Sequence, residues 1–155
     1  EISAYSLLPM MHLAAPLMAE KGGSVVALSY LASQRVIPNY NVMGSAKAAL
    51  EHSVRQLAYE LGPQNIRVNT ISAGPVNTVS ARGISGFTTM LGDARDRAPM
   101  KRNITGEEVG KFIDGITHDL RKLHDCWHRR TLHGTVPGPT PPVPARTINM
   151  TRFNA

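Results

Sequence analysis

The sequence predicts an α/β protein with a parallel sheet, and three observations support this fold class. Residues 24–30 and 66–71 are short, apolar and rich in β-branched side chains, which is typical of buried parallel strands. Residues 4–20 and 40–61 carry apolar side chains at helical spacing, one helix ahead of each strand. Because helix and strand alternate through residues 1–110, successive strands are expected to run parallel.

The first helix and strand are simple to place. Residues 4–20 are apolar on most faces of a helix, and Gly22 and Gly23 follow it as a glycine C-cap would. The strand at residues 24–30 then ends on a tyrosine. The loop after it contains Pro38, which fixes φ and lacks a backbone donor.

The second helix is predicted over residues 40–61, where apolar side chains recur at spacings of three and four. These are Val42, Met43, Ala46, Ala49, Leu50, Val54, Leu57, Ala58 and Leu61. Gly62-Pro63 ends the helix. The next strand leads into a turn at residues 72–75 and a helical stretch at residues 79–91 that is rich in Gly, Ser and Thr.

The composition changes near Gly110, which predicts a boundary between a folded part, residues 1–110, and a tail, residues 111–155. The tail holds four of the six His, the only Trp and five of the eleven Pro. Proline cannot sustain a helix or a central strand. We therefore expect a disordered Pro/Arg-rich tail, with no regular structure and few long-range contacts in residues 136–155.

The net charge of +6 comes mainly from this tail. Residues 1–110 hold 10 Lys or Arg against 8 Asp or Glu, and residues 111–155 hold 7 against 3. No ladder of aromatic side chains accompanies the basic residues, so no nucleic-acid partner is expected. No membrane partner is expected either, because no apolar run reaches the roughly 18–20 residues that a membrane helix needs. The single cysteine, Cys126, excludes an internal disulfide.

Two tyrosines and a lysine form the candidate site. Tyr30 lies at the carboxyl end of a predicted strand, where ligands bind in open α/β sheets. Tyr40 and Lys47 are seven residues apart, so a helix places them on one face, about 10 Å apart along its axis. A nearby lysine favours negative charge and can lower the pKa of a phenol, as a proton donor or oxyanion stabiliser requires. From spacing alone, however, such residues are more often ordinary surface residues.

Three segments in order carry a family resemblance. Residues 30–51 read YLASQRVIPNYNVMGSAKAALE, residues 66–78 read IRVNTISAGPVNT, and residues 98–110 contain APMKR and EEVG. In this order and spacing they resemble the NADH-dependent enoyl-acyl carrier protein reductases of the short-chain dehydrogenase superfamily. The resemblance covers essentially all of residues 1–110 and implies part of a Rossmann-type, doubly wound parallel sheet.

The position of the phenol separates this family from its relatives. Most short-chain dehydrogenases carry a Ser, a Tyr and a Lys at spacings that would place the Ser at position 30 and the Tyr at position 43. This sequence has Tyr30 and Met43 there, and its phenol lies at Tyr40, nearly one helical turn earlier. A relocated phenol suits the carbonyl of an enoyl thioester rather than the carbon being reduced.

The resemblance implies hydride transfer from NADH to the β-carbon of a trans-2-enoyl thioester on acyl carrier protein, in fatty acid biosynthesis. Tyr40 would hydrogen-bond the thioester oxygen, Tyr30 would line the acyl pocket, and Lys47 would bind the nicotinamide ribose. Further cofactor contacts would come from Ala73, Gly74, Pro75, Val76, Thr78 and Ser80. The resemblance also implies a homotetramer in the bacterial cytoplasm or a plastid-type organelle. It implies no metal site. Thr78 alone could equally cap a turn.

The family resemblance also implies a Gly-rich dinucleotide loop upstream and a last strand downstream, and this sequence contains neither motif. We therefore expect a C-terminal half of such an enzyme, inactive by itself, with a tail from a shifted reading frame. The choice between NADH and NADPH stays open. Alternatives are another short-chain reductase, an interaction fragment using the Pro-rich stretch, or a zinc site in the tail. Its ligands would come from His118, His124, Cys126, His128 and His133.

Overall fold

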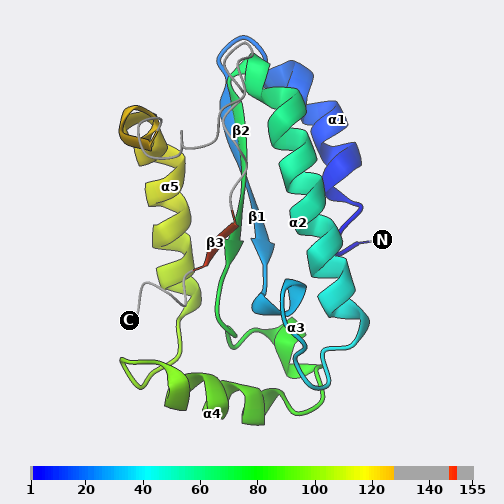
Figure 1. Ribbon diagram of the computed structural model, residues 1–155, viewed down its shortest axis with the longest axis vertical. Helices are drawn as coiled ribbons and strands as arrows, with labels where there is room; N and C mark the ends of the chain where they lie inside the picture. Colours follow the sequence, from blue (N-terminus) through cyan, green and yellow to red (C-terminus); the bar gives the residue numbers. More distant parts are fainter. Residues whose placement is uncertain (1, 128–146, 150–155) are drawn as a thin grey trace, which may run out of the picture.

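The computed structural model describes residues 2–127 and 147–149, with the backbone alone for residues 118–127 and 147–149. The elements in chain order are α1 (Leu7–Met18), β1 (Gly23–Ser29), the 3₁₀-helix η1 (Leu31–Ser33), α2 (Val42–Leu61), the 3₁₀-helix η2 (Gly62–Gln64), β2 (Ile66–Ser72), α3 (Val79–Arg82), α4 (Phe87–Arg97), α5 (Gly106–Trp127) and β3 (Thr147–Asn149). Figure 1 shows α1 and α2 on one side of the strands, α5 on the other, and α4 across one end.

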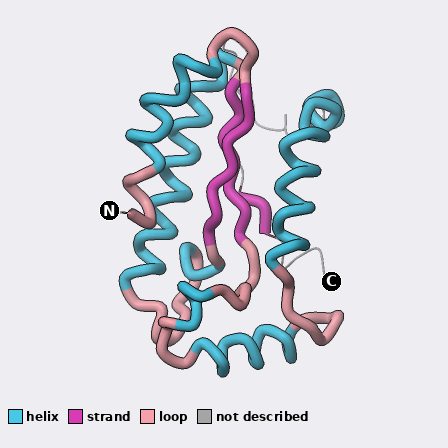
Figure 2. Tube along the Cα trace, turned by 180° about the vertical axis from the view of Figure 1, so that it is seen from behind, coloured by secondary structure: helices cyan, strands magenta, loops and turns pink. Residues whose placement is uncertain are grey.

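The three strands form a parallel sheet in the order β1-β2-β3, as expected for an α/β protein. In the register of β1 and β2, Gly23 lies opposite Ile66 and Ser29 opposite Ser72. The two strands therefore end side by side, and the segments after them leave the same edge of the sheet (Figure 2).

Alternate residues of β2 face opposite sides of the sheet, so it contributes to two apolar clusters. Ile66 and Val68 join the first cluster, with the buried side chains of α1 and α2: Met11, Ala15, Leu50, Val54, Leu57 and Ala58, together with Ala27 of β1. Ile71 joins the second cluster, with Ala73 and two side chains of α5, Val109 and Ile116.

Several element boundaries differ from the sequence prediction for local reasons. α1 ends at Met18 with Ala19 in a right-handed conformation, so Gly22 is not its cap. Instead Gly22 has φ +69° in the turn before β1, and an added Cβ would lie 2.6 Å from the Asn65 carbonyl oxygen. The helix predicted over residues 79–91 is two helices, α3 and α4, and Gly86 adopts φ +74° between them.

The expectation of an irregular tail was wrong in two places. α5 runs through Gly110, because Val109, Phe112, Ile113 and Ile116 continue an apolar helical spacing against the second cluster. Residues 147–149 form β3, although residues 136–155 were expected to have no regular structure. The prolines stop at position 144, and Thr147 and Ile148 are β-branched residues suited to a strand beside β2. The rest of that prediction lies outside the described residues.

Within residues 2–127 and 147–149, no helix combines the length and the apolar character that crossing a bilayer requires.

Candidate functional site

The two tyrosines singled out by the sequence meet at the carboxyl end of β1. Tyr30 follows the last residue of the strand, and its ring centroid lies 5.0 Å from that of Tyr40 at a tilt of 55°. Tyr40 does not belong to the helix, as the sequence analysis had assumed, because α2 begins at Val42. Tyr40 therefore does not share a helix face with Lys47, and it comes to the site through its contact with Tyr30.

Lys47 reaches the same end of β1 from the second turn of α2. Its Nζ donates a hydrogen bond of 2.8 Å to the carbonyl oxygen of Leu28, two residues before Tyr30. An ammonium group has three donors, so this bond leaves two for a ligand. The structure thus gathers Tyr30, Tyr40 and Lys47 around one strand end.

Burial sets the protonation of this group. It raises the pKa of Tyr30, with a smaller contribution from the neighbouring Tyr40. Burial also raises the pKa of Tyr40 and lowers the pKa of Lys47. Contrary to the expectation, the lysine does not lower the pKa of either phenol, because loss of water around the two phenols raises both pKa values. Both phenols keep their protons at neutral pH and can donate hydrogen bonds.

A buried carboxylate on α2 was missed by the sequence analysis. Glu51 is only 2% exposed, and its Oε1 accepts hydrogen bonds of 2.6 Å from the Oγ atoms of Ser29 and Ser33. Its Oε2 lies 3.5 Å from Nη2 of Arg55. The available signal was the position of Glu51 between Leu50 and Val54, on the apolar face of a helix where an acidic residue is unusual.

The predicted cofactor loop follows β2 directly. Ala73 is buried in the second cluster, and Val76 packs against it. Thr78 precedes α3, and its Oγ1 accepts a hydrogen bond of 3.2 Å from the backbone N–H of Ala81, so it does cap a helix turn. Gly74 and Pro75 are partly buried and Ser80 is exposed within α3. Ser29 and Ser72 are paired in the sheet, so this loop starts beside Tyr30.

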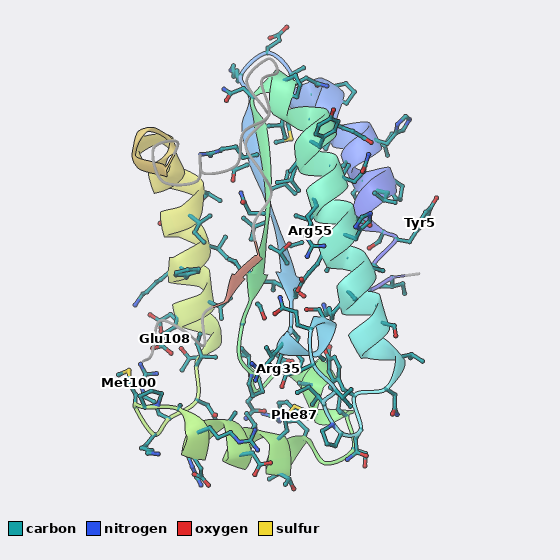
Figure 3. The ribbon with its side chains drawn as sticks, in the orientation of Figure 1. Tyr5, Arg35, Arg55, Phe87, Met100 and Glu108 are labelled. Carbon is teal, nitrogen blue, oxygen red and sulfur yellow. The ribbon has the colours of Figure 1, made fainter. Side chains whose placement is uncertain are left out.

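α4 lies across this end of the sheet and contacts Tyr30 through Met90 (Figure 1). The hydroxyl of Tyr30 donates to Sδ of Met90 at 3.4 Å. Phe87 is 7% exposed and lies between α4 and the strand ends (Figure 3). Gly86 lies close to the loop before α2, since an added Cβ would be 3.3 Å from Nδ2 of Asn39.

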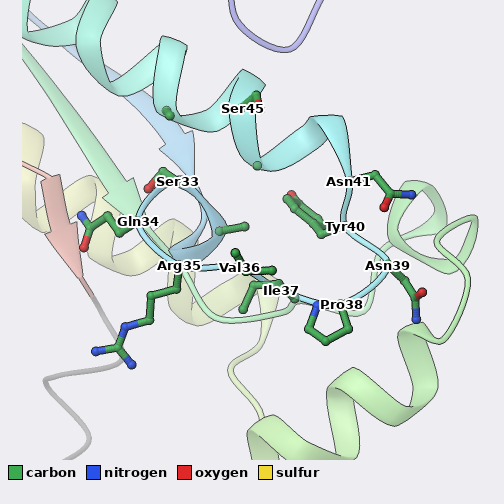
Figure 4. Close-up of a pocket in the computed structure, with 13 residues that line it drawn as sticks. Ser33, Gln34, Arg35, Val36, Ile37, Pro38, Asn39, Tyr40, Asn41 and Ser45 are labelled. Atoms are coloured by element: carbon green, nitrogen blue, oxygen red, sulfur yellow. The ribbon is translucent and has the colours of Figure 1, made fainter.

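An open cavity of about 570 Å³ lies next to the pair, between η1, the loop after it and the start of α2. Tyr40, Gly44, Ser45 and residues 32–39 are among those that line it, whereas Tyr30 and Lys47 are not. Figure 4 shows Tyr40 facing the loop of Val36, Ile37 and Pro38. Only one of the three candidate residues therefore borders this cavity.

Among the described residues, no group of three or more His, Cys, Asp or Glu side chains is arranged to hold a metal ion. The side chains of the tail histidines and of Cys126 lie outside the described part of the chain.

Comparison of sequences agrees with the family resemblance. The family model described as enoyl-(acyl carrier protein) reductase matches residues 1–122. A Bacillus subtilis enoyl-acyl carrier protein reductase named for NADH is 57% identical over 121 residues, which cover 78% of this chain and 46% of the relative. A Staphylococcus aureus reductase named for NADPH is 53% identical over 120 residues, covering 77% and 46%. A Rickettsia prowazekii reductase named for NADH is 56% identical over 133 residues, covering 81% and 50%.

Comparison of structures gives the same result. A Bacillus cereus enoyl-acyl carrier protein reductase, solved with NADP⁺ and an indole naphthyridinone, superposes with a TM-score of 0.75 at 41% identity, covering 95% of this chain and 49% of that one. An Aquifex aeolicus enoyl-acyl carrier protein reductase (NADH) gives 0.76 at 35% identity, covering 95% and 50%. The predicted fold class is confirmed, and the chain spans about half the length of the curated relatives it matches.

Proposed function

The chain belongs to the enoyl-acyl carrier protein reductase family, and we propose that it supplies the tyrosine–lysine part of a site that reduces the trans-2 double bond of enoyl thioesters in fatty acid synthesis. The observation that carries the proposal is the packing of Tyr30 against Tyr40 at the end of β1. Lys47 joins them there, because its Nζ donates a hydrogen bond to the carbonyl oxygen of Leu28. Ligands of open α/β sheets bind beyond such strand ends.

Tyr40 acts on the thioester. Its raised pKa keeps the phenol protonated at neutral pH, so it donates a hydrogen bond to the thioester oxygen as enolate charge develops there. Tyr30 lines the acyl chain and holds the Tyr40 ring from one side. A reduced nicotinamide, when bound, supplies the hydride for the β-carbon.

The residues present fit a nicotinamide dinucleotide. Lys47 has two N–H donors beyond its bond to Leu28, enough for two ribose hydroxyls. The Thr78 hydroxyl accepts from Ala81 and so keeps its own proton for a phosphate or carboxamide oxygen. The remaining contacts come from the loop beside Tyr30 and the start of α3: Ala73, Gly74, Pro75, Val76 and Ser80. We propose NADH as the hydride donor because the family resemblance implies it, and relatives named for NADH and for NADPH both match the chain.

Turnover requires more protein than this chain. The chain spans 46% of the Bacillus subtilis relative, and a dinucleotide extends over much more surface than one ribose. Positioning of two reactants supplies several kcal/mol of barrier lowering that hydrogen-bond donors alone cannot replace. The 155-residue chain alone is therefore expected not to reduce enoyl thioesters.

A chimera tests the proposal. The 121 residues that match the Bacillus subtilis reductase replace their counterparts in it, and NADH oxidation is followed with a crotonyl thioester. The chimera should turn over, and Tyr40→Phe should lower kcat by roughly 100- to 1,000-fold, as loss of an oxyanion donor does. Tyr59→Phe is the matched control, because Tyr59 is on α2 and 66% exposed. Full activity of the Tyr40→Phe chimera would refute the assigned role.

The isolated chain is tested in the same assay. Fluorescence titration with NADH should show no saturable binding, and no crotonyl thioester should be reduced. Saturable binding with turnover that is lost in Tyr40→Phe would overturn the requirement for more protein while supporting the site.

We propose the substrate carrier, the assembly and the compartment from the same family resemblance. Acyl carrier protein carries the substrate, four copies of the intact enzyme assemble, and the compartment is the bacterial cytoplasm or a plastid-type organelle. The relatives that match are bacterial. Light scattering of the chimera measures its assembly, and a monomer would contradict the tetramer.

A further inference from the structure

Glu51 is a buried carboxylate that accepts two side-chain hydrogen bonds, both from the segment around Tyr30. Its Oε1 accepts from Ser29 Oγ and Ser33 Oγ, each at 2.6 Å, and the residue is only 2% exposed. Burying a carboxylate is unfavourable unless hydrogen bonds replace the water it loses. The two hydroxyls, with Arg55 at 3.5 Å from Oε2, provide that replacement.

The two serines are the last residues of neighbouring elements. Ser29 ends β1 and Ser33 ends η1, so Tyr30 lies on the short stretch between them. One carboxylate oxygen therefore ties both ends of the stretch to α2. One helical turn earlier on α2, Lys47 donates a hydrogen bond to the Leu28 carbonyl oxygen. Two side chains of α2, Lys47 and Glu51, therefore bind the end of β1.

α2 and η1 also approach closely by their backbones. A Cβ added at Gly44 would lie 3.0 Å from the carbonyl oxygen of Ala32. The Tyr30 hydroxyl is held only weakly, because it donates its hydrogen bond to the thioether of Met90, which is a poor acceptor. The position of its ring must then depend on how the backbone on either side is fixed.

We propose that Glu51 is a positioning residue for Tyr30: through Ser29 and Ser33 it fixes the stretch that presents the Tyr30 ring to Tyr40. The geometry concerns the folded chain alone. Its consequence for catalysis rests on the proposed function, since a misplaced Tyr30 would leave Tyr40 unsupported.

A structural role without positioning is the competing explanation. In that case Glu51 would only add stability by joining α2 to β1, and its loss would lower the melting temperature without moving Tyr30. The two explanations differ in the Tyr30–Tyr40 contact, which can be measured without any turnover. Failure of the proposed enzymatic function would leave this measurement interpretable.

The test uses NMR of the full chain labelled with ¹³Cζ-tyrosine and carrying ring protons. Ser33→Ala removes one donor and keeps the carboxylate paired with Ser29, so it is the least disruptive variant. Glu51→Ala removes the acceptor, and Glu51→Gln restores an acceptor oxygen. Ser53→Ala is the matched control, because Ser53 lies on the same helix and donates only to its own backbone at Ala49.

Ser33→Ala and Glu51→Ala should lose most of the cross-relaxation between the Tyr30 and Tyr40 rings. The pKa of Tyr30, raised by burial, should fall toward its ordinary value. Glu51→Gln should recover most of both signals, and Ser53→Ala should match the parent. Unchanged ring contacts and an unchanged Tyr30 titration in Ser33→Ala would overturn the proposal, whatever the melting temperature does. Ser33→Ala also decides the question if Glu51→Ala does not fold.

Discussion

Within the part of the chain whose side chains the structure describes, one face of the sheet carries the larger apolar cluster, and we call it the deeper face. Among the described residues, nine buried side chains make up the apolar cluster under α1 and α2, and four make up the one under α5. Tyr40, Lys47 and Glu51 all come from the α2 side. The deeper face thus carries the candidate chemistry, which agrees with the need for rigid support around a site.

The α5 face is organised differently, by polar contacts at its edge. Glu108 accepts hydrogen bonds of 2.6 and 3.0 Å from the guanidinium of Arg102, beside the first turn of α5 (Figure 3). The Arg67 guanidinium, from β2, donates to the Thr117 carbonyl oxygen at 3.2 Å. This contrast predicts that variants on the two faces differ in the size and the kind of their effects on stability.

The largest difference is expected in core truncation. Ile66→Ala, at a residue 1% exposed in the deeper cluster, should lower the free energy of unfolding by about 2–5 kcal/mol, through lost burial and the cavity left behind. Ile116→Ala, in the smaller cluster, should lower it by less. Urea denaturation of both variants measures the difference, and equal losses would show that the two faces support the fold equally.

These faces were only partly predictable from the sequence. Val25, Val68 and their neighbours gave both long strands within a residue or two, because β-branched apolar runs leave few alternatives. α2 was placed similarly well by its apolar spacing. The break between α3 and α4 was missed, because a helical pattern does not reveal that Gly86 will adopt a left-handed conformation.

The candidate site was less predictable than the fold. Spacing suggested that Tyr40 and Lys47 share a helix face, yet the contact that matters joins Tyr40 to Tyr30 across a loop. The roles of Ser29 and Ser33 depend on Glu51, which is 22 residues beyond Ser29 and 18 residues beyond Ser33. Such pairings are set by tertiary packing, which no local pattern encodes. The catalytic and cofactor roles themselves stay predictions.

The next largest effect is expected at the start of α5. Thr105 Oγ1 accepts from the backbone N–H of Glu108 at 3.2 Å, and the Glu108 carboxylate accepts from the backbone N–H of Thr105 at 2.9 Å, which is a capping box. Thr105→Ala should lower the free energy of unfolding by about 1 kcal/mol. Thr88→Ala, at an exposed position within α4, is the control and should change it little. Equal effects of the two would contradict a capping role.

A smaller effect of opposite sign is expected within the sheet. Thr70 is fully buried, and its hydroxyl has no hydrogen-bond partner among the residues that the structure describes. Thr70→Val removes an unpaired polar atom at nearly constant volume, so stability should rise by up to about 1 kcal/mol. The reverse change two residues earlier on the same face of β2, Val68→Thr, should lower stability. Thermal unfolding compares the two, and a loss in Thr70→Val would indicate that the hydroxyl is paired.

The smallest effect is expected from the ion pair at the edge of the α5 face, and it depends on pH. The guanidinium of Arg102 lowers the pKa of Glu108 to about 2, with help from the backbone N–H of Thr105. A carboxyl whose pKa is lowered on folding stabilises the fold above its ordinary pKa of 4.5, and this stabilisation is lost as the pH falls toward 2. The difference in stability between the parent and Glu108→Gln should therefore be constant near neutral pH and shrink below about pH 4.5.

Solvent screening keeps this contribution small, because both side chains lie at the surface and added salt weakens them further. NMR titration of the Glu108 carboxyl carbon measures its pKa directly. Arg102→Met is the control, since it removes the guanidinium and leaves the Thr105 backbone bond, so the pKa should rise part of the way toward 4.5. If Arg102→Met left the titration unchanged, the capping box alone would account for the lowered pKa. The polar edge of the α5 face would then differ from the deeper face through its helix cap rather than through an ion pair.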